Sequence, residues 1–168
     1  MFVQDKADGT IRTVHDFRPL NKVIKRKVYI LLLFNTPEYQ SLTKINISMQ
    51  YYAFHLDEEF TWYCVSITPF GKYRLMCLAM GHVQSANYAQ AAKEEVFDDL
   101  RQQVAVYIND IKTQHMEWKE HLEMVDEILR RLLAYGFMVN PLKCEWGVQE
   151  MDFLGYHLTP KGPRPWVK

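Results

Sequence analysis

The sequence has few cysteines, no net charge and no long apolar run, and each of these absences narrows what the protein can be. Its three cysteines, Cys64, Cys77 and Cys144, are odd in number and far apart. They argue against a disulfide framework or a structural zinc site and indicate a reducing intracellular compartment, the cytoplasm or the nucleus. With 20 basic and 20 acidic residues, the chain has no overall charge that would attract nucleic acid.

Apolar residues are abundant but do not form a membrane-spanning run. The apolar stretch from Tyr29 to Phe34 is too short to cross a bilayer, and no secretory signal peptide is recognisable, so we expect no membrane partner. Hydrophobic residues make up 48% of the chain and charged residues 24%, which favours a packed core over disorder. A length of 168 residues fits one domain or a lobe of a larger one.

Two short apolar segments carry polar residues in a pattern that is typical of a metal site. The run at residues 104–108 predicts a buried strand, and Asn109-Asp110 then breaks it, which predicts a tight hairpin with a polar pair at its tip. Residues 43–48 predict a second strand, in which Asn46 lies between isoleucines. Polar residues held on two strands predict a carboxylate cluster for a divalent ion, although two of the three expected carboxylates are amides here.

These segments resemble the active site of reverse transcriptases. Tyr107-Ile108-Asn109-Asp110 is similar to the Tyr-x-Asp-Asp hairpin of that family with its first Asp replaced by Asn, and Asn46 takes the place of the other metal-binding Asp. The strongest likeness is to the gypsy-like class of long-terminal-repeat retrotransposons, and it runs from about Phe2 to about Pro165. The resemblance implies an RNA-directed DNA polymerase domain, a nucleotidyltransferase that uses Mg²⁺, with fingers and palm only and a degenerate active site.

Residues 12–21 match the fingers signature Arg-x-x-x-Asp-(Phe/Tyr)-Arg-x-Leu-Asn of the same family. The resemblance implies that Arg12 and a nearby lysine, for which Lys6 is the best candidate, bind the triphosphate of the incoming deoxynucleotide (dNTP). The residue types suit this role, because arginine offers phosphate a planar fork and lysine a point charge. Tyr51 takes the position of the aromatic residue that excludes ribonucleotides; an ordinary core aromatic is the alternative.

Three further motifs extend the resemblance toward the C-terminus. Leu78-Ala79-Met80-Gly81 resembles Leu-Pro-Met-Gly, in which Met80 and Gly81 would form the floor under the template and nucleotide. Lys143 takes the place of a lysine that is a candidate proton donor or phosphate neutraliser. Phe153-Leu154-Gly155-Tyr156 matches the primer-grip hairpin. Relative to the family, prolines are lost at positions 30, 32, 79 and 86, which indicates relaxed constraint.

We expect an α+β fold, in which an antiparallel palm sheet is backed by two long helices and joined to a small β-rich fingers lobe. Residues 1–42, with part of 60–85, would form the fingers; residues 43–162 would form the palm with its primer-grip-like hairpin, and residues 163–168 would begin a missing thumb or connection. The second long helix shows an apolar stripe and ends near Gly136. The stripe consists of Trp118, Leu122, Val125, Leu129 and Leu132.

Replacing carboxylates by amides should weaken metal binding more than it affects the fold. Positions 46, 109 and 110 carry Asn, Asn and Asp, so that only Asp110 is anionic. A unit charge pair about 4 Å apart is worth about 4 kcal/mol at an effective dielectric of about 20, and a divalent ion doubles this value. A net loss of a few kcal/mol lowers metal affinity by roughly a thousandfold, so we expect Mg²⁺ to bind weakly or not at all.

Three functions are compatible with the sequence. The first is a catalytically inactive domain derived from an RNA-directed DNA polymerase, whose basic fingers could still bind primer–template nucleic acid. The second is an active polymerase fragment that binds primer–template and dNTP with weakened metal binding. The third is a non-catalytic scaffold that reuses the fold to bind a protein partner. Whether the chain is an enzyme is left open by these alternatives, which we rank in the order given.

Overall fold

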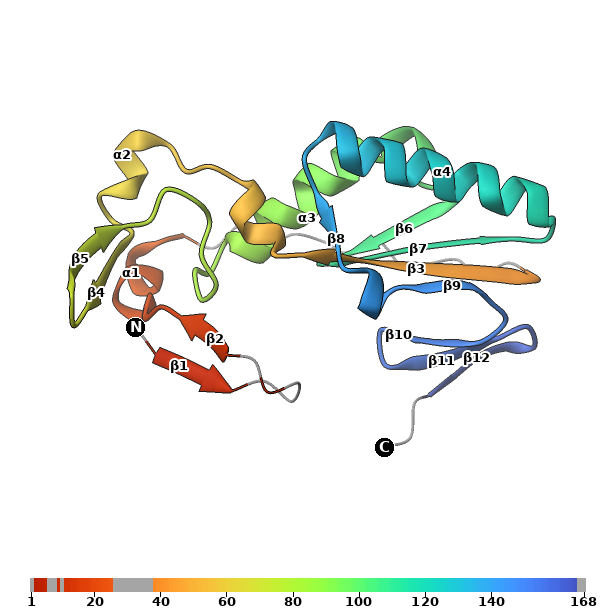
Figure 1. Cartoon of the computed structure of the whole chain (residues 1–168), viewed down its shortest axis with the longest axis horizontal. Coiled ribbons are helices and arrows are strands. Elements are labelled where there is room, and N and C mark those ends of the chain that lie inside the picture. The colour runs from red at the N-terminus through yellow and green to blue at the C-terminus, as the bar shows by residue number, and fades with distance from the viewer. Residues whose placement is uncertain (1, 6–8, 10, 26–37, 166–168) are drawn as a thin grey trace. The chain divides into compact units, whose positions relative to one another are not determined.

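The chain folds into two compact units, which together contain short strands and a few helices (Figure 1). The structure is a computed structural model and describes residues 2–5, 9, 11–25 and 38–165. The first unit consists of Met1–Tyr29 and Met49–Ala91, and the second of Ile30–Ser48 and Ala92–Lys168. Helix α3 (Ser85–Val96) begins in the first unit and ends in the second.

The first unit contains two separate two-stranded antiparallel sheets, β1–β2 and β4–β5. The turn at Pro69-Phe70 joins β4 to β5 in a hairpin, since Thr68 pairs with Gly71 across it. The elements of this unit are β1 (Phe2–Asp5), β2 (Ile11–Val14), α1 (Arg18–Val23), η1 (Gln50–Ala53), α2 (Glu58–Thr61), β4 (Val65–Thr68) and β5 (Gly71–Arg74).

The last residue of the fingers signature, Asn21, has a visible structural role in the first unit. Its side-chain Nδ2 donates to the carbonyl oxygen of Gly81 (2.8 Å), and its Oδ1 accepts from the backbone N–H of Val83 (2.9 Å). Gly81 itself has a φ of 98°, and a Cβ at this position would lie 2.9 Å from the backbone oxygen of His15. The motif therefore holds a loop that only glycine can complete without strain.

The second unit is built around an antiparallel sheet in the order β6–β7–β3–β8, with β9 also paired to β3. In Figure 1, α4 lies above this sheet and the small sheet β10–β11–β12 lies below it. The elements are β3 (Ser41–Ser48), η2 (Asp98–Leu100), β6 (Val104–Tyr107), β7 (Asp110–His115), α4 (Trp118–Ala134), β8 (Met138–Val139), η3 (Pro141–Lys143), β9 (Glu145–Val148), β10 (Met151–Phe153), β11 (Tyr156–Thr159) and β12 (Gly162–Pro165).

Strand β3 is covered on both faces, which explains its nearly continuous burial. Successive side chains of a strand point to opposite faces. Leu42 packs with Phe153 and Leu158 of the small sheet, whereas the hydroxyl of the next residue, Thr43, lies 2.7 Å from Nε2 of His121 in α4. The central strand of the predicted palm is therefore enclosed between a helix and a second sheet.

Helix α4 is present as predicted and ends before Gly136, whose φ of 72° is typical of a C′ glycine. The predicted buried stripe is wrong at its N-terminal end, because Trp118 is 54% and Leu122 49% exposed while His121 is buried. His121 can occupy this core position because Thr43 satisfies its ring nitrogen. Like every other helix in the described part of the chain, α4 lacks the length and apolar character that a membrane span requires.

The geometry at Gly81 predicts a large effect of adding one methyl group. Gly81→Ala should lower the free energy of unfolding by about 2–4 kcal/mol, because the methyl group meets a backbone oxygen and the φ is unfavourable for alanine. Gly155→Ala is the matched control, since Gly155 also has a positive φ (78°) but no atom lies within 4 Å of the place that its methyl group would take. Urea unfolding of both variants measures the difference; equal losses would contradict the steric argument.

The contact between partly buried His115 and buried His121 predicts that the fold weakens in mild acid. Their Nδ1 atoms lie 3.3 Å apart, and burial holds the pKa of both imidazoles below the usual value, with His115 lowering that of His121 further. The unfolded chain therefore binds more protons as the pH falls through about 6.5, and the native state loses stability in that range. We expect the urea midpoint to fall between pH 7.5 and 5.5, and to fall less in His115→Gln. An equal fall in both proteins would rule out this pair as the cause.

Candidate functional site

The predicted polar hairpin is formed by β6 and β7, but its tip lies one residue earlier than expected. Tyr107 pairs directly with Asp110, so that the turn consists of Ile108 and Asn109 and Asp110 is the first residue of β7. Ile108 has a φ of 47°, a left-handed conformation that is costly for a β-branched residue. The predicted tip at Asn109-Asp110 is corrected accordingly, because the two-residue turn leaves Asp110 inside the strand ladder.

The strand register brings the three predicted site residues together. Asn46 of β3 lies directly opposite Asp110 of β7, and its side-chain Nδ2 donates to Asp110 Oδ1 at 2.7 Å. The backbone N–H of Ile47 donates to the carbonyl oxygen of Asn109 at 2.7 Å, which ties the turn to β3. Positions 46, 109 and 110 therefore meet at one end of the sheet, as the sequence predicted.

Asn46 is also held from its other side by the segment that follows α4. Its backbone N–H donates to the sulfur of Cys144 (3.2 Å), and the Cys144 thiol donates to the carbonyl oxygen of Asn140 (3.1 Å). The N–H of Asn140 donates in turn to the carbonyl oxygen of Asn46 (2.8 Å). Asn46 is 8% exposed, so its amide has little freedom to turn away from Asp110.

Ala89, Lys93, Val96 and Phe97 recur at helical spacing in α3 and directly after it, and this pattern assigned Lys93 no role at the site. The structure buries its side chain completely. Burial lowers the pKa of the Lys93 amine to about 7, and the negative charge of Asp110 acts in the opposite direction. The available signal was a lysine at a stripe position near Val96 and Phe97, where an apolar residue is the usual choice.

Two further lysines lie next to the site, on the face of the sheet that carries Asn46 and Asp110. Lys44 and Lys112 are opposite each other, two residues along their strands from Asn46 and Asp110. Lys44 forms an ion pair with Glu145, whereas Lys112 is buried and donates to Gln114 Oε1 (2.6 Å). Burial lowers the pKa of the Lys112 amine to about 8.

The donor set at positions 46, 109 and 110 does not fit a pair of divalent ions. It offers one carboxylate and two neutral amides, and the Asn46 amide donates an N–H to the Oδ1 atom of that carboxylate, Asp110. Nowhere in residues 2–5, 9, 11–25 and 38–165 do three or more His, Cys, Asp or Glu side chains gather in a way that could hold a metal ion. Lys112, a buried lysine two residues along β7 from Asp110, lies on the same face of the sheet and adds positive charge beside the site.

The predicted nucleotide-binding residues are divided between the two units. Tyr51 lies in η1 of the first unit, where burial raises the pKa of its hydroxyl, and Met80 and Gly81 lie in the loop that Asn21 holds. Arg12 belongs to β2 of the same unit, and Lys6 lies outside the described residues. The roles of these residues stay predictions.

The other predicted site residues belong to the second unit. Lys143 is exposed at the end of η3, close to β3 in the fold. The predicted primer-grip hairpin is formed by β10 and β11, in which Phe153 pairs with Tyr156. Leu154 and Gly155 make its turn with φ values of 54° and 78°, as a two-residue hairpin of the right twist requires.

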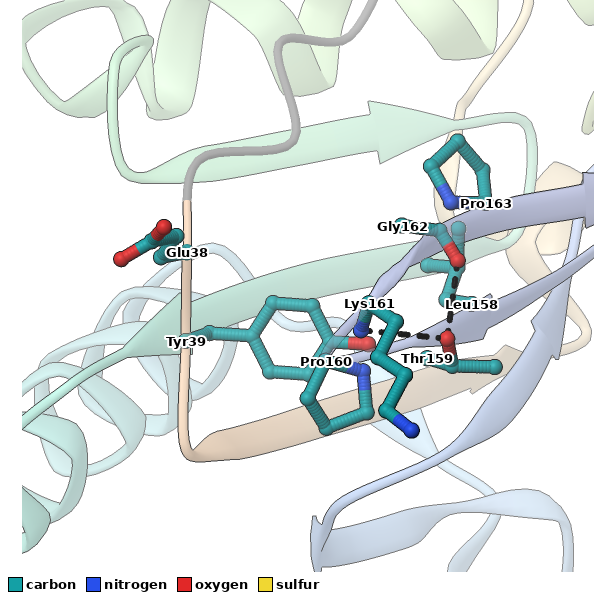
Figure 2. Close-up of a pocket in the computed structure, with 8 residues that line it drawn as sticks. All are labelled: Glu38, Tyr39, Leu158, Thr159, Pro160, Lys161, Gly162 and Pro163. Atoms are coloured by element: carbon teal, nitrogen blue, oxygen red, sulfur yellow. Dashed lines mark hydrogen bonds between the residues drawn. The ribbon is translucent and has the colours of Figure 1, made fainter.

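A hollow of about 290 Å³ lies in the second unit, between the residues before β3 and the turn that joins β11 to β12 (Figure 2). Tyr39 is 6% exposed, and its buried hydroxyl has no hydrogen-bond partner among the residues that the structure describes. The turn is braced by Thr159, whose Oγ1 donates to the carbonyl oxygen of Gly162 (2.9 Å) and accepts from the N–H of Lys161 (3.2 Å). None of the residues predicted for the active site lines this hollow.

The contact between Asn46 and Asp110 predicts how a restored carboxylate would behave. Asn46→Asp should lower the free energy of unfolding by about 1–3 kcal/mol at pH 7.5, because it replaces a hydrogen bond by two facing carboxylates. Repulsion raises a carboxyl pKa in the folded state, so the loss should shrink as the pH falls and a proton is taken up. Asn109→Asp is the control with a smaller effect, and urea unfolding at pH 7.5 and 5 measures both. A loss that stays the same at both pH values would contradict the carboxylate contact.

Comparison with known proteins identifies the family to which this architecture belongs. A family model described as reverse transcriptase (RNA-dependent DNA polymerase) matches residues 4–158. The transposon Tf2-3 and Tf2-7 polyproteins of Schizosaccharomyces pombe are each 26% identical over 171 residues, which cover 98% of this chain and 13% of theirs. The chain thus spans about an eighth of the length of these relatives.

Solved structures show the same fold. A foamy viral protease–reverse transcriptase in complex with double-stranded DNA has a TM-score of 0.90 at 22% identity, over 97% of this chain and 30% of that one. The same kind of protein in complex with an RNA/DNA hybrid has a TM-score of 0.87 at 22% identity, over 96% of this chain and 22% of that one. The predicted α+β fold and the predicted family are both confirmed. Because the family model matches most of its length, the chain belongs to the reverse transcriptase (RNA-dependent DNA polymerase) family.

Proposed function

We propose that this chain is a reverse-transcriptase domain that does not catalyse nucleotide addition. The observation that carries the proposal is the hydrogen bond from Asn46 Nδ2 to Asp110 Oδ1 (2.7 Å). An amide N–H in this place satisfies the carboxylate from within the protein, where an active site of this family would direct a second carboxylate at a cation. The family generally uses Mg²⁺, and the donor set described above is poorly suited to it.

The physical reason lies in the charge that phosphoryl transfer requires. Two-metal polymerases hold divalent ions about 4 Å apart, and the ions stabilise the attacking and leaving oxygens. Such ions are held by anionic oxygens, and the described site supplies one such side chain, Asp110, instead of three. Its residues can orient one another through Asn46, Asn109 and Cys144, but they do not supply the negative charge that the chemistry needs.

We further propose that the domain binds nucleic acid through contacts other than the catalytic residues. Three solved structures with the same fold are complexes with DNA or with an RNA/DNA hybrid. In the first unit, the side chains of Lys22, Lys25, Lys72 and Arg74 are exposed and available to phosphates. Because the chain is a small part of its polyprotein relatives, the binding should be weak in isolation and sensitive to salt.

The division into lobes that the sequence predicted belongs to this proposal. Residues 1–42, with part of 60–85, would serve as fingers, residues 43–162 as palm, and residues 163–168 as the start of a thumb or connection. Arg12, Lys6 and Tyr51 would face an incoming nucleotide, and the hairpin at residues 153–156 would face the primer. A thumb supplied by the rest of a longer chain or by a partner would strengthen the grip on a duplex.

A primer-extension assay tests the proposed loss of activity. The unmodified chain should extend a primer on an RNA template no faster than a blank reaction, with Mg²⁺ or with Mn²⁺. The physical reason is that one carboxylate does not supply enough negative charge to bind two divalent cations. An active reverse transcriptase in the same buffer serves as the positive control. Extension by the unmodified chain at a rate above the blank would overturn the proposal in favour of an active fragment.

Binding of the same primer–template duplex, followed by fluorescence anisotropy, is the accompanying control. Binding that weakens steeply with salt shows that the protein is folded and that the absence of extension is a chemical defect. No binding at any salt concentration, together with a stable protein partner, would favour the scaffold function instead.

A further inference from the structure

The β4–β5 hairpin and the turn before it carry aromatic and basic side chains but no acid. The chain leaves α2 at Thr61 and enters the hairpin at Val65 (Figure 1). Residues 60–74 contain five aromatic and two basic residues and neither Asp nor Glu, so that this segment is positively charged in a chain that is neutral as a whole. The acids that precede it are those at the start of α2, Asp57, Glu58 and Glu59.

The alternation of side chains along the strands gives this hairpin one packed face and one open face. Ser66 belongs to the packed face, since it is 5% exposed and its Oγ lies 3.0 Å from Nδ1 of His15. Residues on either side of Ser66 in β4, and their partners across the ladder, point the other way. This open face consists of two cross-strand pairs of exposed residues, Val65 with Arg74 and Ile67 with Lys72.

Trp62 joins the open face through Arg74. The Cζ atom of Arg74 lies 4.3 Å from the centroid of the Trp62 ring, a cation–π contact that fixes the two groups against each other. Trp62 is nevertheless 68% exposed, so most of its surface stays open to solvent. Among the residues that the structure describes, neither Arg74 nor Lys72 forms an ion pair. We call this set the hairpin face: Trp62, Val65, Ile67, Lys72 and Arg74.

The chemistry of the hairpin face matches an unpaired nucleic acid strand better than another protein. Lysine is depleted at protein interfaces, whereas cations beside an exposed aromatic ring are typical of surfaces that bind single strands. An indole ring stacks on a base only where the face of that base is open, and in a duplex the neighbouring base pairs cover both faces. The exposed tryptophan therefore favours a strand whose bases are not stacked on one another.

We propose that the hairpin face binds single-stranded nucleic acid, with a base stacked on Trp62 and the adjoining phosphates held by Lys72 and Arg74. The inference rests on the proposed binding of nucleic acid and deepens it, because it names the surface and the form of the strand. Phosphate contacts set how steeply the binding depends on salt. Stacking on Trp62 adds affinity without adding to that dependence, so the two contributions are separable by experiment.

Fluorescence anisotropy of a labelled single-stranded oligodeoxythymidylate tests the inference, with the same strand annealed to its complement as a second probe. Trp62→Ala should weaken binding of the single strand by about fivefold or more, and leave both the salt dependence and the binding of the duplex unchanged. Trp62→Phe should recover much of the loss, because phenylalanine also stacks on bases. Lys72→Met should instead reduce the slope of log affinity against log salt by about 0.7, the value for one phosphate of a single strand.

Trp146→Ala is the matched control, because Trp146 is 45% exposed but lies on β9 of the second unit, and its loss should leave the affinity unchanged. Equal affinities of the Trp62→Ala and Trp146→Ala variants for the single strand would overturn the inference. So would an equal loss with single strand and duplex. A change in the oligomeric state of Trp62→Ala by light scattering, with unchanged oligonucleotide binding, would assign the face to a protein contact instead.

Two further measurements keep the result unambiguous. If circular dichroism shows that Trp62→Ala does not fold, Trp62→Leu takes its place, because leucine keeps an apolar side chain but has no ring to stack. The unmodified chain also separates this inference from the proposed function. Binding of neither probe would overturn both, whereas binding of the duplex together with no effect of Trp62→Ala on the single strand would overturn the inference alone.

Discussion

The antiparallel pairing of β3 with β7 is the constraint on which the rest of the second unit depends. It sets Asn46 opposite Asp110 and Lys44 opposite Lys112, and the hydrogen bond between Asn46 and Asp110 follows from that register. A shift by one residue would exchange the two faces of β3, taking Leu42 away from the small sheet and Thr43 away from His121. The hydrophobic packing on both sides of β3 therefore also keeps the amide and the carboxylate in contact.

The same backbone could in principle hold either a metal site or a neutral polar cluster, and the side chains decide between them. Aspartate and asparagine have nearly the same shape, so the register, the turn and the packing around β3 do not depend on which is present. What differs is the charge that the protein must balance: three carboxylates need external cations, whereas the single carboxylate of Asp110 accepts an N–H from the Asn46 amide. The family fold is thus compatible with loss of its chemistry.

Motif and spacing were sufficient to predict the family, the central hairpin and the meeting of positions 46, 109 and 110, because local sequence determines strand and turn. They did not predict contacts that depend on tertiary pairing. The buried face of α4 differs from the predicted apolar stripe because Thr43 satisfies the ring of buried His121. The turn lies one residue earlier than predicted because Tyr107 pairs with Asp110. The complete burial of Lys93 depends on how α3 packs against the rest of the second unit, and helical periodicity alone could not reveal it.

The left-handed backbone of Ile108 makes position 108 a place where substitution can stabilise the hairpin. A branched residue with a φ of 47° raises the energy of the native state by roughly 1 kcal/mol, and glycine or asparagine would remove most of it. The ladder between Tyr107 and Asp110 and the bond from Ile47 to Asn109 hold the turn in this geometry from both ends. Replacing Ile108 by glycine or asparagine would therefore remove backbone strain from the turn and leave Asn46, Asn109 and Asp110 in their present positions.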